Sequence, residues 1–179
     1  MIRFVFLISL VVALTACSTK PRVIDRSTDT VYSEYFENDS TVLDGALRLH
    51  TIMTMGDERV PEDHVWSEVA RKRLQRNSDV FPMVLEVYAT NLSDAPMEIS
   101  FVSIEPRNKN RVFPENMATI EPGAFQKSPA LVHTTSIYVP RVFDHFLEVT
   151  VDGEKVVVEG EVRRLTMDEL EARAGNAAR

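Results

Sequence analysis

The chain has 179 residues, 44% of them hydrophobic, and its 20 basic and 27 acidic side chains give a formal net charge of −7. This length accommodates one domain with a substantial core and leaves little room for two. The acidic balance excludes non-specific nucleic-acid binding, which requires neutralised phosphates, so we expect no nucleic-acid partner. A single cysteine, Cys17, excludes a disulfide within the chain.

The N-terminus has the layout of an export signal. Arg3 precedes an apolar run from Phe4 to Ala13 that is about half the ~20 residues needed to cross a bilayer as a helix. A positive residue, a short apolar core and a small-residue site are typical of a secretory signal peptide. We therefore predict a signal peptide over residues 1–16 and a flexible tether over residues 17–29.

The end of this signal, Leu14-Thr15-Ala16-Cys17, resembles the lipobox of bacterial lipoproteins. The resemblance implies that Cys17 is acylated and becomes the first residue after cleavage, with the covalent acyl chains in place of any cofactor. In that family, Ser18 after the cysteine implies release to the outer membrane, facing the periplasm, rather than retention in the inner membrane. The alternative is an ordinary signal peptide with an incidental cysteine.

Residues 30–165 are predicted to form the folded domain, starting with short strands. Thr30 to Phe36 predicts a first short strand or an apolar patch laid on the domain, and Glu37 to Ser40 predicts a turn. Leu43 to Met53 alternates apolar and polar residues and predicts a half-buried strand with His50 on its solvent face.

The periodicity then changes to that of a helix, over about residues 61–76. Pro61 suits a first turn, and basic residues follow near the C-terminal end, where they complement the helix dipole. We expect this inserted helix to pack on an edge or end of the sheet through Trp66. Its predicted apolar face comprises Val65, Trp66, Val69, Ala70 and Leu74.

Two strong strands follow, over Phe81 to Ala89 and Met97 to Phe101, separated by the polar turn Asn91 to Pro96. This strand, turn and strand pattern resembles that of extracytoplasmic immunoglobulin-like domains. Further short strands are predicted over Arg111 to Phe113, Ala118 to Glu121 and Ala124 to His133.

Asp152-Gly153 predicts a two-residue hairpin with a type I′ turn. The register that follows pairs Val149 with Val156 and Leu147 with Val158 on one face. A short helix over about 167–174 is predicted next, with Thr166 and Glu169 as a capping box, within a C-terminal tail of residues 166–179. Together these elements predict a mainly β fold, an antiparallel immunoglobulin-like sandwich of two sheets and about seven strands.

The sequence contains no recognisable catalytic, cofactor or metal motif. The histidines at 50, 64, 133 and 145 are too far apart in sequence for common zinc motifs. We expect His145 to cap the apolar face of the last hairpin.

Two residue groups could support recognition. Aromatic residues could form a protein-binding patch, with core or edge packing as the alternative; they are Tyr32, Tyr35, Phe36 and Trp66. Basic residues near the helix end could contact anionic lipid, with a solvated helix end as the alternative; they are Arg71, Lys72, Arg73 and Arg76.

The function expected from these patterns is that of a non-enzymatic, lipid-anchored envelope protein. It would act as an accessory or assembly factor that binds another periplasmic or outer-membrane protein. A ligand-binding lipoprotein would need an apolar pocket of several hundred Å³. A hydrolase would need a nucleophile, a base and an orienting group at one place.

Overall fold

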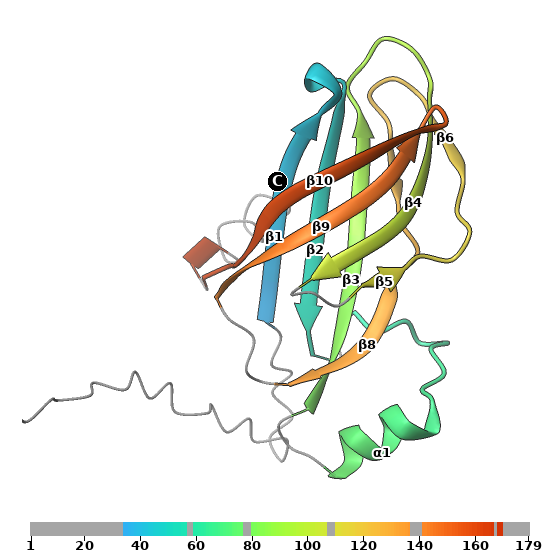
Figure 1. Ribbon diagram of the computed structural model, residues 1–179. Helices are drawn as coiled ribbons and strands as arrows, with labels where there is room; N and C mark the ends of the chain where they lie inside the picture. Colours follow the sequence, from blue (N-terminus) through green and yellow to red (C-terminus); the bar gives the residue numbers. More distant parts are fainter. Residues whose placement is uncertain are drawn as a thin grey trace, which may run out of the picture.

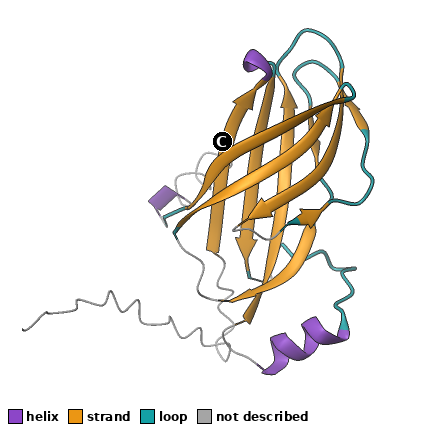
Figure 2. Cartoon of the chain, viewed as in Figure 1, coloured by secondary structure: helices purple, strands orange, loops and turns teal. Residues whose placement is uncertain are grey.

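A computed structural model describes residues 34–56, 59–76, 80–106, 110–136, 141–166 and 168–169. Strands make up most of this part of the chain, and loops gather at the two ends of the molecule (Figures 1 and 2). The elements, in chain order, are β1 (Glu34–Val42), the 3-10 turn η1 (Leu43–Gly45), β2 (Leu47–Met55), α1 (Glu68–Arg76), β3 (Val80–Asn91), β4 (Met97–Pro106), β5 (Arg111–Val112), β6 (Ala118–Ile120), β7 (Phe125–Lys127), β8 (Leu131–Ser136), β9 (Val142–Val151) and β10 (Glu154–Arg164).

The strands form one antiparallel sheet that curls into two layers. Its order is β5-β4-β9-β10-β1-β2-β3-β7, with β6 beside β4 and β8 beside β3. β9 and β10 cross diagonally in front of β1, β2 and β3 (Figure 1). The mainly β, antiparallel, sandwich-like fold is thus confirmed, but the described residues form one curled sheet of ten strands rather than two sheets with about seven.

The core lies between the two layers. Alternate residues of the long strands point inward, as the pleat requires, and they form one buried hydrophobic cluster. Its largest fully buried members include Phe36, Leu49, Met53, Phe101, Ile104 and Leu147.

The last hairpin folds as predicted. Asp152 and Gly153 have positive φ angles of 48° and 83°, as a type I′ turn requires. Val149 pairs with Val156, and Leu147 pairs with Val158.

The prediction for the first two strands was wrong at their junction. Glu37 to Ser40 lie inside β1, because their polar side chains find partners on neighbouring strands: Asp39 with Arg48, and Asn38 with the Glu161 carbonyl. The reversal falls instead at Leu43–Gly45, where Leu43 is exposed rather than buried and has a positive φ of 53°.

The inserted helix is shorter than predicted. It begins at Glu68, after Ser67, whose Oγ accepts a hydrogen bond from the Ala70 N–H at 3.2 Å. An N-cap of this kind fixes where a helix starts. Residues 61–67 are therefore irregular, and no side chain of α1 is buried. The predicted apolar face does not form.

Two further predictions are refined. The single strand expected over Ala124 to His133 is split into β7 and β8 around Pro129, which has no backbone N–H to donate.

At the C-terminal end, the predicted capping box is confirmed. Thr166 N–H donates to Glu169 Oε2 at 2.8 Å, and Glu169 N–H donates to Thr166 Oγ1 at 3.3 Å. The rest of that predicted helix lies outside the described residues.

The two ends of the sandwich differ. Four turns meet at what we term the distal end, where Leu92 N–H donates to Ala46 O, Asn91 N–H to Ala124 O, and Asp152 N–H to Glu98 O. The other, proximal end holds the start of β1 and the end of β10, since Leu165 N–H donates to Tyr35 O. α1 lies at this proximal end (Figure 1). None of the described helices is long and apolar enough to cross a membrane.

Candidate functional site

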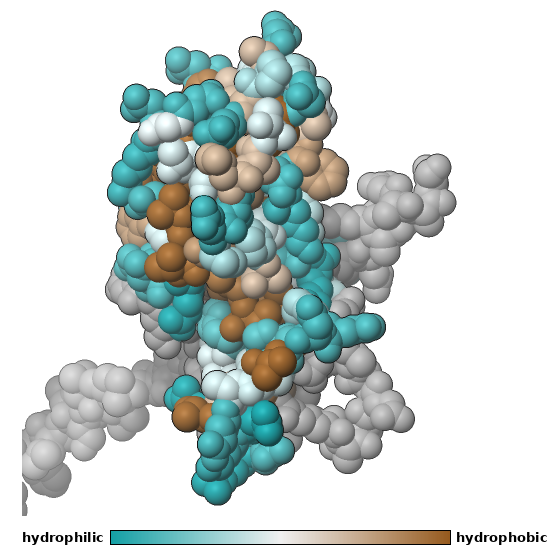
Figure 3. Space-filling view, turned by 90° about the vertical axis from the view of Figure 1, so that its right-hand side faces the viewer, coloured by the Kyte–Doolittle hydropathy of each residue, from teal (hydrophilic) through white to brown (hydrophobic). Residues whose placement is uncertain are grey.

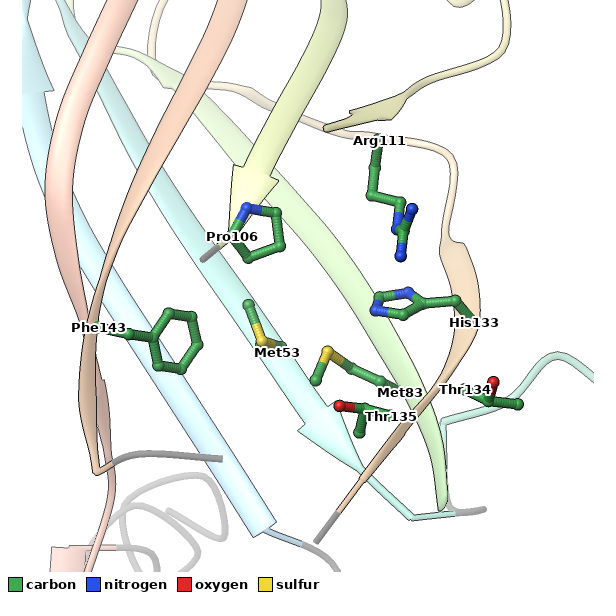
Figure 4. A pocket seen from close by; sticks show the side chains of 8 residues that line it. All are labelled: Met53, Met83, Pro106, Arg111, His133, Thr134, Thr135 and Phe143. Carbon is green, nitrogen blue, oxygen red and sulfur yellow. The ribbon is translucent and has the colours of Figure 1, made fainter. Parts of the chain in front are cut away.

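A small cavity opens between the two layers near the proximal end (Figure 4). Apolar side chains from three different strands and Pro106 of β4 form one part of its wall. The polar part comes from Arg111 on β5 and from β8. The full lining is Met53, Met83, Pro106, Arg111, His133, Thr134, Thr135 and Phe143.

The polar wall of this cavity is centred on two side chains. Figure 4 shows the guanidinium of Arg111 above the ring of His133. Nε of Arg111 is buried and has no hydrogen-bond partner among the described residues. The guanidinium of Arg111, the ring of His133 and the hydroxyl of Thr135 suit a small anion or water better than a cation, whereas the side chain of Thr134 lies on the other side of β8 (Figure 4).

The size and lining of the cavity limit its chemistry. It encloses about 40 Å³, which is room for a few water molecules, since one needs roughly 10–15 Å³. Organic-ligand pockets are typically roughly 300–1,000 Å³. No carboxylate lines it, so these eight residues assemble neither an acid–base carboxylate pair nor a triad in which an acid orients the histidine.

A polar cluster covers the outer face of β3. Glu86 has a side chain only 5% exposed, and both of its oxygens are engaged. Arg59 Nη1 lies 2.9 Å from one oxygen, and Lys127 Nζ lies 2.7 Å from the other. The rings of Tyr35 and Tyr88 lie beside these cations, at 6.0 Å and 5.8 Å.

The charges in this cluster stabilise one another. Burial lowers the pKa of Arg59, but the hydrogen bond and the charge of Glu86 outweigh it, so the net shift is upward. The hydrogen bond to Glu86 likewise raises the pKa of Lys127. Because both carboxylate oxygens are occupied, Glu86 is arranged as a structural ion pair rather than as a general base. Sequence analysis did not single out these three residues, since they are far apart in the chain.

The predicted aromatic patch is not assembled as a surface. Phe36 is fully buried and packs on Phe143, with ring centroids 5.8 Å apart, so it belongs to the core and its assignment to the patch was wrong. Tyr35 lies half-buried under Arg59, and Trp66 packs edge-on against His64 at 4.6 Å. Tyr32 lies outside the described residues, as does Cys17.

The four histidines are dispersed, and among the described residues no group of His, Cys, Asp and Glu could hold a metal ion. His50 is partly buried and faces Glu37 at 3.2 Å. His145 is fully buried on the inner face of β9, as predicted, with Nδ1 3.0 Å from the Gly160 carbonyl. Desolvation lowers the pKa of His145.

The basic residues of α1 are all exposed. Lys72 pairs with Glu68 at 2.5 Å, and Arg71 donates to the Trp66 carbonyl at 3.3 Å. Arg73 and Arg76 form no ion pair with any described residue. Arg73 and Arg76 therefore carry positive charge that no described acidic side chain neutralises.

Comparison with known proteins finds no matching family model and no matching curated protein. Among solved structures, the chain is similar to Northeast Structural Genomics Consortium target SoR45, at 12% identity and a TM-score of 0.38, over 70% of this chain and 89% of that one. It is also similar to a FixG-related protein from Vibrio parahaemolyticus, at 11% identity and a TM-score of 0.31, over 67% and 94%. Likenesses this distant bear on neither family nor function.

Proposed function

We propose that this chain is a lipid-anchored envelope protein, without enzymatic activity, whose sandwich binds another protein of the periplasm or outer membrane. The observation that carries the proposal is the sequence Leu14-Thr15-Ala16-Cys17 at the end of a short apolar run. Each buried methylene of an acyl chain adds ~0.8 kcal/mol to membrane affinity, so several chains on Cys17 would anchor the protein durably.

The binding half of the proposal is supported by the interior of the sandwich. The core is filled by side chains, and the cavity described above encloses about 40 Å³, which is too small for an organic ligand of ordinary size. Because this cavity does not suit an organic ligand, the described loops and sheet faces are the surfaces we propose for binding a macromolecule. The distal turns are the part of the sandwich farthest from the start of β1.

The anchor is tested by replacing the acylated residue. We expect Cys17→Ser to abolish incorporation of labelled palmitate and to move the protein from the membrane fraction to the soluble fraction. Ser18→Ala keeps the cysteine and serves as the matched control, which should remain acylated. Acylation of Cys17→Ser, or an unchanged membrane fraction, would overturn the anchor.

The partner is tested by site-specific photocrosslinking in intact cells. A photoreactive residue at Leu92, in a distal turn, is compared with one at Val157, on an outer sheet face; the two positions are 51% and 55% exposed. We expect a discrete adduct with one envelope protein from Leu92 and none from Val157. Absence of discrete adducts from both positions, with acylation intact, would leave the anchor and overturn the binding role.

A further inference from the structure

α1 exposes apolar side chains that a helix of a folded domain normally buries. Val69 is 69% exposed, and Val65, just before the helix, is 83% exposed. A surface helix usually turns its apolar stripe toward the core. In α1 only two apolar residues, Ala70 and Leu74, are half-buried, and they lie on the side of the helix that contacts β3 and β8.

The outward side of α1 combines an apolar residue with positive charge. Val69, Lys72, Arg73 and Arg76 are spaced i, i+3, i+4 and i+7 and therefore share one face. All four are exposed. In Figure 3, hydrophobic surface lies next to strongly hydrophilic surface at the lower end of the molecule, where Figure 1 places α1.

The opposite end of the sandwich has the opposite charge. The four distal turns, residues 43–46, 92–96, 121–124 and 152–153, contain four exposed acids and neither lysine nor arginine. Those acids are Asp44, Asp94, Glu121 and Asp152. The chain as a whole is acidic, at −7, so the positive face of α1 runs against the overall charge.

The path of the chain brings this positive face toward the proposed anchor. β1 begins at Glu34, which pairs with Met55 at the proximal end, and α1 lies at the same end (Figure 1). Residues 18–33 connect Cys17 to that point, and a chain of this length reaches at most ~55 Å even when fully extended. An acyl group on Cys17 would thus tether the sandwich from its proximal end, within ~55 Å of the bilayer.

We propose that the outward face of α1 docks on the anionic phospholipid headgroups of the membrane that holds the acyl chains, so that the distal turns point away from the bilayer. The inference rests on the proposed lipid anchor. Val69 inserts among the headgroups, and Lys72, Arg73 and Arg76 contact their phosphates. Each basic residue near an anionic surface contributes about fivefold to such an equilibrium.

The test uses the acylated, full-length protein in lipid vesicles. Cys17 is the sole cysteine of the chain, so with the lipid attached, Val69→Cys supplies one free thiol for a fluorophore. Leu92→Cys supplies the matched label at the distal end. The vesicles contain phosphatidylethanolamine with phosphatidylglycerol, or phosphatidylcholine alone, and each includes a lipid with a headgroup-attached quencher.

We expect quenching of the Val69 label in phosphatidylglycerol vesicles only, and no quenching of the Leu92 label in either. Arg73→Gln with Arg76→Gln should shift the docking equilibrium about thirtyfold, and 1 M salt should release the helix because it shortens the Debye length to ~3 Å. Lys155→Gln, which removes a distal charge, should leave quenching unchanged.

The outcomes separate the two proposals. If the protein is anchored but the Val69 label is quenched no more than the Leu92 label, the docking of α1 is overturned and the anchor stands. If the wild-type protein is recovered unacylated in the soluble fraction, both proposals fall. Equal quenching of Val69 in both vesicle types would show apolar insertion without headgroup recognition and would overturn the electrostatic docking.

Discussion

The side chain of Asn116 acts as a strand partner for the backbone of Phe101. Phe101 N–H donates to Asn116 Oδ1 at 2.7 Å, and Asn116 Nδ2 donates to the Phe101 carbonyl at 2.8 Å. β5 and β6 pair with β4 on the two sides of Phe101. The side chain of Asn116 therefore fills the gap between these two strands with hydrogen bonds to β4. Ser128 does the same for Val87 on β3, through its N–H, which donates to the Val87 carbonyl, and its Oγ, which accepts from the Val87 N–H.

Asn116→Ala is therefore expected to reduce the free energy of unfolding by ~2 kcal/mol, because it leaves an N–H and a carbonyl of β4 without their partners. Asn116→Asp keeps the acceptor and loses the donor, so its loss should be smaller. Urea denaturation followed by circular dichroism measures both. Asn110→Ala, an exposed residue on the same segment, is the control and should change stability by less than ~0.5 kcal/mol.

Asn91 organises the turn between β3 and β4. It is fully buried, and Nδ2 donates to the carbonyls of Ala95 and Ile120, both at 2.8 Å. Its Oδ1 accepts from the N–H and the Oγ of Ser93. Asn91→Ala should cost ~2–4 kcal/mol, since several polar groups lose their partners together.

Ser93→Ala provides the comparison for that prediction. It removes one hydroxyl and leaves Nδ2 of Asn91 bonded to both carbonyls, so we expect a loss of ~1 kcal/mol. Equal urea midpoints for the two variants would contradict the central position of Asn91 in this turn.

Local signals predicted some elements well. Asp152-Gly153 specifies both a turn and a register, because its φ preferences and the apolar alternation on either side agree, and the hairpin of β9 and β10 follows the prediction pair by pair. The capping box of Thr166 and Glu169 was equally local.

Elements and clusters that depend on distant partners could not be predicted. Asp39 belongs to a strand because Arg48, diagonal to it on β2, pairs with its carboxylate, and nothing near Asp39 in the sequence distinguishes that from a turn. Likewise, the cations that neutralise Glu86 come from a loop before α1 and from β7. Only the topology of the sheet brings them together.

In the ion cluster of Glu86, removing the carboxylate should cost less stability than removing the two cations that neutralise it. Arg59 and Lys127 are 36% and 45% exposed, so both can regain water if the carboxylate is removed. We expect Glu86→Gln to reduce the free energy of unfolding by less than ~1.5 kcal/mol, about the net contribution of an ordinary hydrogen bond. Removing both cations, by Arg59→Met with Lys127→Met, leaves a buried unpaired carboxylate and should cost ~3–5 kcal/mol.

Chemical denaturation of these variants measures the asymmetry directly. Arg48→Met removes a cation from an exposed pair with Asp39 and should have a small effect, ~0–1 kcal/mol, because exposed ion pairs contribute little. If Glu86→Gln lost as much free energy of unfolding as the double variant, the prediction would be wrong. The fold would then depend on the carboxylate itself and not on its neutralisation by Arg59 and Lys127.

His145 should make the fold sensitive to mild acid. Its ring is fully buried, and desolvation lowers its pKa below the ordinary value of 6.5. As the pH falls below 6.5, the unfolded chain takes up a proton that the folded chain does not. Stability is therefore complete above this pH and declines below it, by at most ~1.4 kcal/mol per pH unit, until the pH passes the pKa of the folded state.

Urea denaturation between pH 7.5 and pH 5 tests this sensitivity, with the slope of unfolding free energy against pH as the readout. His145→Leu removes the titrating group and should flatten the slope, although it also deprives the Gly160 carbonyl of its partner and lowers stability at every pH. Ser93→Ala, which lowers stability without removing a titratable group, is the control and should retain the wild-type slope. An unchanged slope in His145→Leu would assign the acid sensitivity to other groups, because a lost hydrogen bond alone shifts the curve without tilting it.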